Sequence, residues 1–197
     1  LWVNTDEIPG NGIDDDGNGY VDDVYGWNFY NNNNQIFTGE EDSHGTHGAG
    51  TISAGTGNGI GIAGIVPGNR VRVMALKALG GTDGGGSTAA VIKAIRYAED
   101  NGAVICNLSL TSTVDDKALY EAMKNSSMLF VVATGNGNPK TGKGVDTDAI
   151  PFYPAAYDLD NIISVANLSI DGTLSASSNY GKKTVDLAAP GSYILST

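Results

Sequence analysis

Cysteines, basic side chains and long apolar runs are scarce in this sequence, and each shortage excludes a class of protein. Cys106 is the only cysteine, which excludes an intrachain disulfide and a cysteine-based zinc site. Eleven basic side chains stand against twenty-two acidic ones, and the formal charge of -11 disfavours nucleic acid and anionic membrane surfaces as partners. No apolar run approaches the roughly 18 residues that cross a bilayer, so we expect no membrane span.

Glycine, by contrast, is abundant, and the chain has the length of a single core. Its 28 glycines are about twice the usual share of ~7%, so many tight turns are expected. A chain of 197 residues can build one full-sized core, so we expect one domain or part of one. Leu1–Val3 is typical of the tail of an element, and the sequence after Tyr193 has no cap or turn. We therefore expect the domain to be incomplete at both ends.

Hydrophobic patterns predict alternating strands and helices after a long loop region at residues 4–42. The predicted strands cover 71–76, 104–109, 128–133, 162–166 and 185–188, and the predicted helices cover 88–101, with Ser87 as N-cap, and 115–125. Strands that are apolar on both faces predict a parallel sheet covered by helices on both sides, an α/β fold. Ligands should then bind at the carboxyl ends of the strands, which carry Asn107–Ser109 and Thr134–Gly137.

Both histidines of the chain lie within four positions, in the stretch DSHGTHGAGT at 42–51. His44 and His47 share one helical face, but the sequence has no nearby cysteine, no third histidine and no H-E-x-x-H pattern, so zinc is not expected. A packed core histidine is the plainer alternative. Gly45 and the small residues after it predict a thin helix that a domain can bury. Such a helix would hold the His44 imidazole at its exposed N-terminal end, as a general base near neutral pH.

Here the sequence resembles the subtilisin-like serine peptidases, the subtilases, whose HGTH-x-AG motif matches residues 44–50. Further segments resemble motifs of that family and follow in the family's order: GIAGIVP (61–67), VMALKAL (73–79), VICNLSL (104–110), VATGN (132–136), YPAAY (153–157), SNYG (178–181) and VDLAAPG (185–191). The resemblance implies a three-layer subtilisin-like α/β fold that is incomplete at both ends. It also implies a partial peptidase domain over 1–197, with an acidic calcium-loop region at 1–41 and a core at 42–197.

The resemblance carries over roles for several residues. His44 would be the catalytic base, and His47 a buried structural histidine. Asn136, after the strand predicted at 128–133, would donate its side-chain NH₂ to the oxyanion, although a turn residue is the plainer alternative. Extended polypeptide substrate would pair with backbone at an open sheet edge, beside Gly84, Gly85, Gly86, Ser109, Leu110, Thr111, Ala133, Thr134 and Gly135. Thr111 stands where the family usually has glycine, which would narrow the primary pocket.

Two segments of the family's catalytic triad do not occur in the sequence: the D-[ST]-G segment with the catalytic Asp, and the GTSMA-x-P segment with the catalytic Ser. The resemblance therefore implies a serine endopeptidase whose Asp and Ser lie outside this chain, so we expect the chain alone to be inactive. The family also allows an inhibitory propeptide as a partner. Apolar surface left by the absent Ser-bearing helix predicts self-association. The alternative function is a non-catalytic, calcium-binding pseudopeptidase that keeps the fold and the cleft.

The stretch DDDGNGYVD at 14–22 fits the first nine positions of an EF-hand loop, with Gly19 at the sharp turn. The oxygens offered to Ca²⁺ belong to Asp14, Asp16, Asn18, the Tyr20 carbonyl and Asp22. Position twelve is Tyr25 and not Glu, so a further oxygen would come from Asp23 or from the pair Asp6 and Glu7. A solvated acidic turn is the alternative, but close carboxylates repel one another unless a cation lies between them. We predict a structural Ca²⁺ site and, from the acidic charge and the family, a secreted, extracellular protein.

Overall fold

Two units make up the protein in the computed structural model, which describes residues 1–68 and 70–197. Residues 1–98 with 195–197 form the first unit, and residues 99–194 form the second. Helix α2 (Thr88–Asp100) begins in the first unit and ends just after the boundary along the chain. Each unit has its own strands, and the predicted site residues divide between the two.

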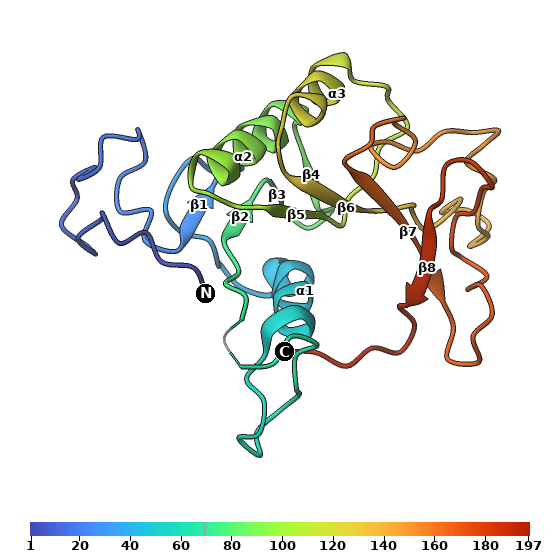
Figure 1. Ribbon diagram of the computed structural model, residues 1–197, viewed down its shortest axis with the longest axis horizontal. Coiled ribbons are helices and arrows are strands. Elements are labelled where there is room, and N and C mark those ends of the chain that lie inside the picture. Colours follow the sequence, from blue (N-terminus) through green and yellow to red (C-terminus); the bar gives the residue numbers. More distant parts are fainter. Residues whose placement is uncertain (69) are drawn as a thin grey trace. The chain divides into compact units, whose positions relative to one another are not determined.

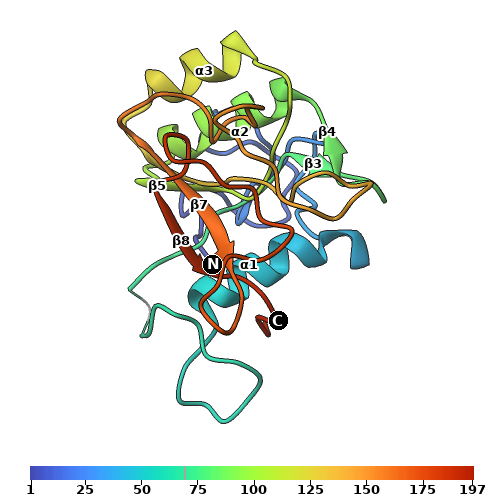
Figure 2. The same ribbon diagram turned by 90° about the vertical axis from the view of Figure 1, so that its right-hand side faces the viewer.

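A four-stranded parallel sheet forms the centre of the second unit (Figure 1). Its strands, in spatial order, are β5 (Ile105–Leu108), β6 (Leu129–Ala133), β7 (Ile162–Leu168) and β8 (Leu187–Pro190). Figure 2 shows β7 and β8 side by side, and both point in the same direction. Phe130 and Val132 of β6 are buried and the other three residues of the strand are half-buried, as expected for a strand inside a parallel sheet.

Helix α3 (Lys117–Lys124) belongs to the same unit. Its N-cap is Asp116, whose carboxylate accepts hydrogen bonds from Ala118 N (2.8 Å) and Leu119 N (3.2 Å). Leu119 and Met123 form its buried stripe. The helix starts two residues after the predicted start at 115, because the Asp116 side chain caps the first turn and does not join it.

Short strands and an aromatic core organise the first unit. β1 (Gly26–Asn28) pairs in parallel with β2 (Ala75–Lys77), and β3 (Leu79–Gly80) pairs antiparallel with β4 (Gly85–Gly86). The 3₁₀ turn η1 (Glu40–Asp42) leads directly into α1 (Ser43–Ser53). The core contains Trp27, Phe29, Ala90, Ala94 and Tyr97.

Tyr20 joins the acidic region to this core. Its ring lies edge-on against Trp27 and Tyr97, with ring centroids 5.1 Å apart in both pairs. Such contacts stabilise by about 0.5–1.5 kcal/mol per pair beyond the burial of apolar area. The Tyr20 ring therefore packs the acidic loop onto the core of the first unit.

The predicted α/β class, with mainly parallel strands, is confirmed. Helix α2 begins at Thr88 as predicted, and the Ser87 hydroxyl oxygen accepts a hydrogen bond from Ala90 N (3.2 Å), as an N-cap does. The bounds predicted for the strand at 71–76 are wrong: β2 covers only Ala75–Lys77, because its partner β1 offers three residues. β1 itself lies in the region predicted as loop, since three residues are too few to show alternation. No helix within 1–68 and 70–197 combines the length and apolarity that a membrane crossing requires.

Candidate active site

His44 lies in the first turn of α1, and its side chain is exposed. Thr46 Oγ1 donates a hydrogen bond to the Asp42 carbonyl (2.9 Å), which ties this turn to η1. The prediction that His47 is buried is wrong: it is exposed, because Gly50 is the one residue that α1 buries. The chain thus presents the His44 imidazole to solvent at the N-terminal end of a helix, where a general base can reach a substrate.

Ion pairs fix the segment that precedes His44. Lys77, the last residue of β2, is buried, and its Nζ lies 2.7 Å from Asp42 Oδ1 and 2.8 Å from Glu41 Oε1. Nζ also donates to Thr38 Oγ1 (3.0 Å), while Asp42 Oδ2 accepts from Thr38 N (2.6 Å). Strand β2 therefore anchors η1, and η1 leads into the helix that carries His44.

The charges in this network favour one another. Burial alone would raise the pKa of Asp42, but hydrogen bonds from Lys77 and Thr38 outweigh it and hold that pKa below its ordinary value. Burial would lower the pKa of Lys77, but Asp42 and Glu41 keep it above its ordinary value. The hydrogen bond from Lys77 is the main cause of a lowered pKa at Glu41. All three groups are therefore charged near neutral pH.

The carboxyl ends of β5 and β6 bring several predicted residues together in the second unit. The two strands are parallel neighbours, so Ser109–Thr111 and Ala133–Gly135 leave the sheet at the same edge. A Cβ at Gly135 would lie 3.4 Å from Thr111 Cγ2, which shows how close the two segments are. Asn136 follows directly, and its side chain is exposed. This edge combines an exposed side-chain amide with two neighbouring chain segments.

The other predicted substrate contacts, Gly84, Gly85 and Gly86, belong to the first unit. Gly85 and Gly86 form β4 and use one edge of that strand to pair with β3. A Cβ at Gly86 would lie 2.8 Å from the Ala78 carbonyl oxygen, so close packing against the backbone at the start of β3 requires glycine there. In the second unit, β5 is an edge strand of the described sheet, and Ser109–Thr111 continues from it.

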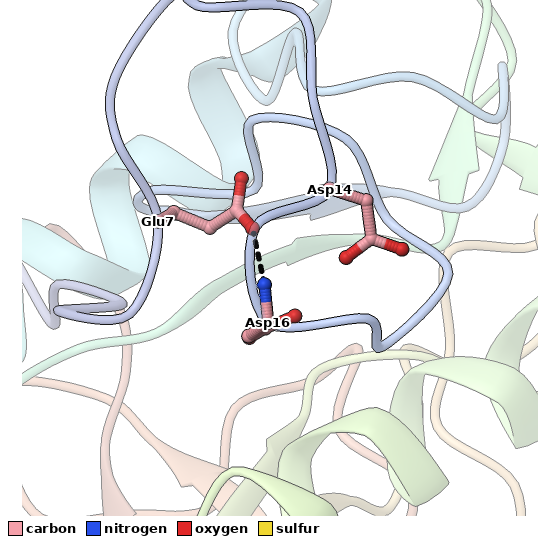
Figure 3. A group of neighbouring side chains, drawn as sticks. All are labelled: Glu7, Asp14 and Asp16. Atoms are coloured by element: carbon pink, nitrogen blue, oxygen red, sulfur yellow. Dashed lines mark hydrogen bonds between the residues drawn. The ribbon is translucent and has the colours of Figure 1, made fainter.

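Three carboxylates of the acidic loop gather around one point (Figure 3). One oxygen each from Glu7, Asp14 and Asp16 lies within 4.8 Å of the other two. Asp14 accepts hydrogen bonds from Asn18 N (3.0 Å) and Gly19 N (2.8 Å), so the loop folds around this side chain. Glu7 is buried, and its Oε1 accepts from Asp16 N (3.3 Å). An all-oxygen donor set of this kind fits Ca²⁺.

The side chains of Asp22 and Asn18, two further predicted ligands of the loop, accept hydrogen bonds from the protein backbone. The Asp22 carboxylate accepts hydrogen bonds from Asn11 N (3.1 Å) and Gly12 N (3.0 Å). Asn18 Oδ1 accepts from Tyr20 N (2.8 Å). These side chains therefore shape the loop backbone around the cluster of Glu7, Asp14 and Asp16.

The third carboxylate of this cluster belongs to Glu7, one of the three residues that the sequence offers for a further oxygen. Asp23 is fully buried, and its carboxylate accepts from Asn4 Nδ2 (2.8 Å), Asn18 Nδ2 (2.9 Å) and the Tyr97 hydroxyl (2.5 Å). Burial is the main cause of a raised pKa at Tyr97, and the hydrogen bond between its hydroxyl and Asp23 is the second cause. Asp23 thus links the loop to α2, a role for which its position in the sequence gives no signal.

Comparison with known proteins gives one consistent result. The model of the subtilase family matches residues 5–197. Thermitase of Thermoactinomyces vulgaris is 38% identical over 177 residues, which cover 88% of this chain and 57% of thermitase. The major intracellular serine protease of Bacillus subtilis is 41% identical over 157 residues, which cover 78% of this chain and 46% of that protein. A crystal structure of a lanthipeptide protease matches with a TM-score of 0.60 and 25% identity, covering 85% of this chain and 48% of the other.

These matches limit and correct what the family resemblance implies. The chain spans about half the length of these relatives, between 46% and 57%. The prediction of a secreted, extracellular protein is wrong as an inference from the family, because a relative 41% identical to this chain is an intracellular protease. Neither the family nor the acidic charge fixes a compartment.

Proposed function

This chain belongs to the subtilase family, and from this premise we propose that it is the central part of a serine endopeptidase domain that hydrolyses polypeptides. The proposed domain has an acidic calcium-loop region at 1–41 and a core at 42–197. The observation that carries the proposal is the joint exposure of His44, in the first turn of α1, and Asn136, at the carboxyl end of β6. A base and an amide donor, each exposed at the end of a regular element, are what acyl transfer requires.

In the proposed mechanism, His44 takes the proton of a nucleophilic serine and returns it to the leaving amine. Asn136 donates its side-chain NH₂ to the oxyanion that forms on the scissile carbonyl. Loss of this donor from subtilisin lowers kcat by about 10²–10³, and this serves as the reference value here. The catalytic Asp and Ser would come from segments outside this chain. The chain alone is therefore proposed to be inactive, because no acyl-enzyme forms without the serine.

The substrate would bind as an added strand. Support comes from Ser109–Thr111, which continues the edge strand β5, beside Ala133–Gly135. Gly84–Gly86 of the first unit are also proposed to supply backbone groups to the substrate. An inhibitory propeptide that blocks the site would use the same edge. Thr111 would narrow the pocket for the side chain next to the cleaved bond.

Self-association of the isolated chain belongs to the same proposal. Val104, just before β5, is 75% exposed, and Ile105, the first residue of β5, is 59% exposed. Leu187 in β8 is 46% exposed. These side chains lie at the two edge strands of the parallel sheet. Exposed apolar side chains at sheet edges favour association between copies.

A structural Ca²⁺ ion is the proposed cofactor. Glu7, Asp14 and Asp16 would hold it with hard oxygen ligands, and the loop pattern adds Asn18, Tyr20 and Asp22 as candidates. The ion would neutralise carboxylates that otherwise repel one another. A non-catalytic, calcium-binding pseudopeptidase is the alternative function, and the same carboxylate cluster favours it.

A serine-reactive fluorophosphonate probe separates the two functions. The protein expressed from the full reading frame should be labelled at one serine outside residues 1–197, and His44→Ala should abolish both the labelling and peptide hydrolysis. His47→Ala is the matched control, because it removes the neighbouring exposed imidazole, and it should keep both. A folded protein that binds Ca²⁺ but takes no label would be a pseudopeptidase.

Calorimetric titration with Ca²⁺ tests the cofactor. Saturation to about 100 times Kd should stabilise the protein by about 2.7 kcal/mol. Asp14→Asn and Glu7→Gln should each remove this binding step. Asp115→Asn, an exposed carboxylate elsewhere, should leave it intact. Trp27 emission offers a second readout, since this ring packs against Tyr20 of the loop.

A further inference from the structure

Asn179 of the SNYG segment is a buried amide whose hydrogen bonds converge on the end of β6. Its exposed fraction is 0%. Nδ2 donates to the Thr134 carbonyl (2.8 Å), and Oδ1 accepts from Val145 N (3.0 Å). The Asn179 main chain adds a third bond, from its N–H to the Gly135 carbonyl (2.9 Å). One residue thus holds the two peptide units that immediately precede Asn136.

Gly135 allows this close approach. Its φ is +102°, a value that L side chains rarely adopt, and a Cβ there would lie 2.6 Å from Asn179 Nδ2. Thr134 is 1% exposed, and its N–H donates to the Val165 carbonyl of β7 (3.1 Å). The backbone at 134–135 is therefore held by the sheet on one side and by Asn179 on the other.

Asn136 projects from this fixed backbone into solvent. Its side chain is exposed, and the chain turns immediately after it at Gly137, where φ is +74°. The position of the Asn136 amide therefore depends on the peptide units at 134–135. Hydrogen-bond donors to an oxyanion act through preorganisation, so a small displacement of that backbone has a large effect on the transition state.

We propose that Asn179 is a positioning residue for the oxyanion donor: it fixes the Thr134–Gly135 backbone so that the exposed Asn136 amide points at the developing charge. Asn179 touches no reacting atom in this proposal and acts only through Asn136. The inference rests on the proposed function, since an oxyanion donor has a role only in an active peptidase. It gives the SNYG segment at 178–181 a role in positioning the proposed oxyanion donor.

The chain offers a matched control at the opposite end of the same strand. Asn161 Nδ2 donates to the carbonyls of Met123 (2.9 Å), Ser126 (3.2 Å) and Met128 (3.2 Å), just before β6 begins. It is also a side-chain amide that clamps backbone carbonyls. Its loss should therefore destabilise the protein in a similar way without moving Asn136.

The experiment is a double-mutant cycle in the full-length protein, with kcat and KM measured on one peptide substrate. Asn179→Ala should lower kcat by about 10–10²-fold, with a much smaller change in KM. In an Asn136→Ala background, the same substitution should lower kcat by less than about threefold, because the donor that it positions is gone. Asn161→Ala should lower the melting temperature but leave kcat within about twofold of the wild type. If Asn179→Ala does not fold, the milder Asn179→Ser enters the same cycle.

The outcomes separate the inference from the function on which it rests. Equal kcat losses from Asn179→Ala in both backgrounds, or an equal loss from Asn161→Ala, would overturn the positioning role and leave the peptidase assignment standing. A wild-type protein that neither hydrolyses peptide nor takes the serine probe would overturn the proposed function, and this inference with it. A kcat loss that disappears without Asn136 supports the proposal.

Discussion

His44 and Asn136, the two exposed residues with a proposed catalytic role, are held in place by different kinds of interaction. We call these interactions the charged support of His44 and the neutral support of Asn136. The helix of His44 follows a segment held by charges, where Lys77 Nζ lies within 2.8 Å of both Asp42 and Glu41. The backbone before Asn136 is held by neutral hydrogen bonds from Asn179, a fully buried amide. Both supports connect an exposed residue with a proposed catalytic role to a buried anchor, but only the first contains titratable groups.

The difference predicts how each support responds to a perturbation. Charged partners are strong only while both remain ionised, and removal of one leaves the other buried without compensation. Neutral amide bonds do not change with pH, but they depend on a close fit, because each bond is short and directional. Substitutions at the neutral support should therefore act through geometry, and those at the charged support through protonation.

The largest effect on stability is expected at Gly135, where Asn179 leaves no room for a side chain. Gly135→Ala forces a φ of +102° onto alanine and places its Cβ 2.6 Å from Asn179 Nδ2. A left-handed conformation costs about 1–2 kcal/mol, and overpacking a tight site adds about 1–3 kcal/mol. We expect a loss of roughly 3 kcal/mol in the free energy of unfolding, measured by circular dichroism in urea.

Gly142→Ala separates these two causes. Gly142 has a φ of +63°, but nothing lies within 4 Å of the position that a Cβ would take. This variant should therefore lose only the conformational part, about 1–2 kcal/mol. Equal losses for the two variants would mean that the contact with Asn179 contributes nothing, and the neutral support would then be loose.

Removal of the Lys77 ammonium group is expected to have the second-largest effect on the free energy of unfolding. Lys77→Met leaves the Asp42 carboxylate, whose side chain is 11% exposed, without its main partner. We expect a loss of about 2–3 kcal/mol, below the ~3–5 kcal/mol of a fully buried pair because solvent still reaches the network. Urea unfolding followed by tryptophan fluorescence measures it. Lys93→Met, an exposed lysine of α2, should change stability by less than about 0.5 kcal/mol, and a comparable loss there would show that the ion pair is not the cause.

The sequence predicts contacts between residues that are close along the chain better than contacts between distant ones, and both supports depend on distant ones. Segments with a local pattern, such as β6 and α2, were identifiable from the residues alone. The motifs around His44 and Asn136 gained their predicted roles from the family resemblance. Asn179 and Thr134 are 45 residues apart, and Lys77 and Glu41 are 36 apart. Hydrogen bonds of that range leave no periodic signal in a sequence, and a polar residue in a loop has the same pattern whether it is buried or solvated. For the same reason, the sequence does not predict that the carboxylate near Asp14 and Asp16 belongs to Glu7 and not to Asp23.

The smallest effect, and the one that best separates the two supports, is the pH dependence of the Lys77→Met loss. Asp42 has a lowered pKa in the folded protein. Its contribution to the free energy of unfolding is therefore present above pH 3.8, its ordinary pKa, and is lost as the pH falls through the lowered pKa. Lys77 has a raised pKa, so its contribution is present below its ordinary value of 10.5 and is lost as the pH rises through the raised value. The difference in unfolding free energy between wild type and Lys77→Met should therefore stay constant between about pH 5 and 10 and shrink on either side.

Asn179→Ala supplies the matching curve for the neutral support. The amide does not titrate, so its difference from the wild type should not change across the same pH series. A Lys77→Met difference that does not shrink in acid would mean that Lys77 holds neither Asp42 nor Glu41 as a carboxylate. In that case the support of His44 would depend on packing, like that of Asn136, and the contrast between the two supports would be lost.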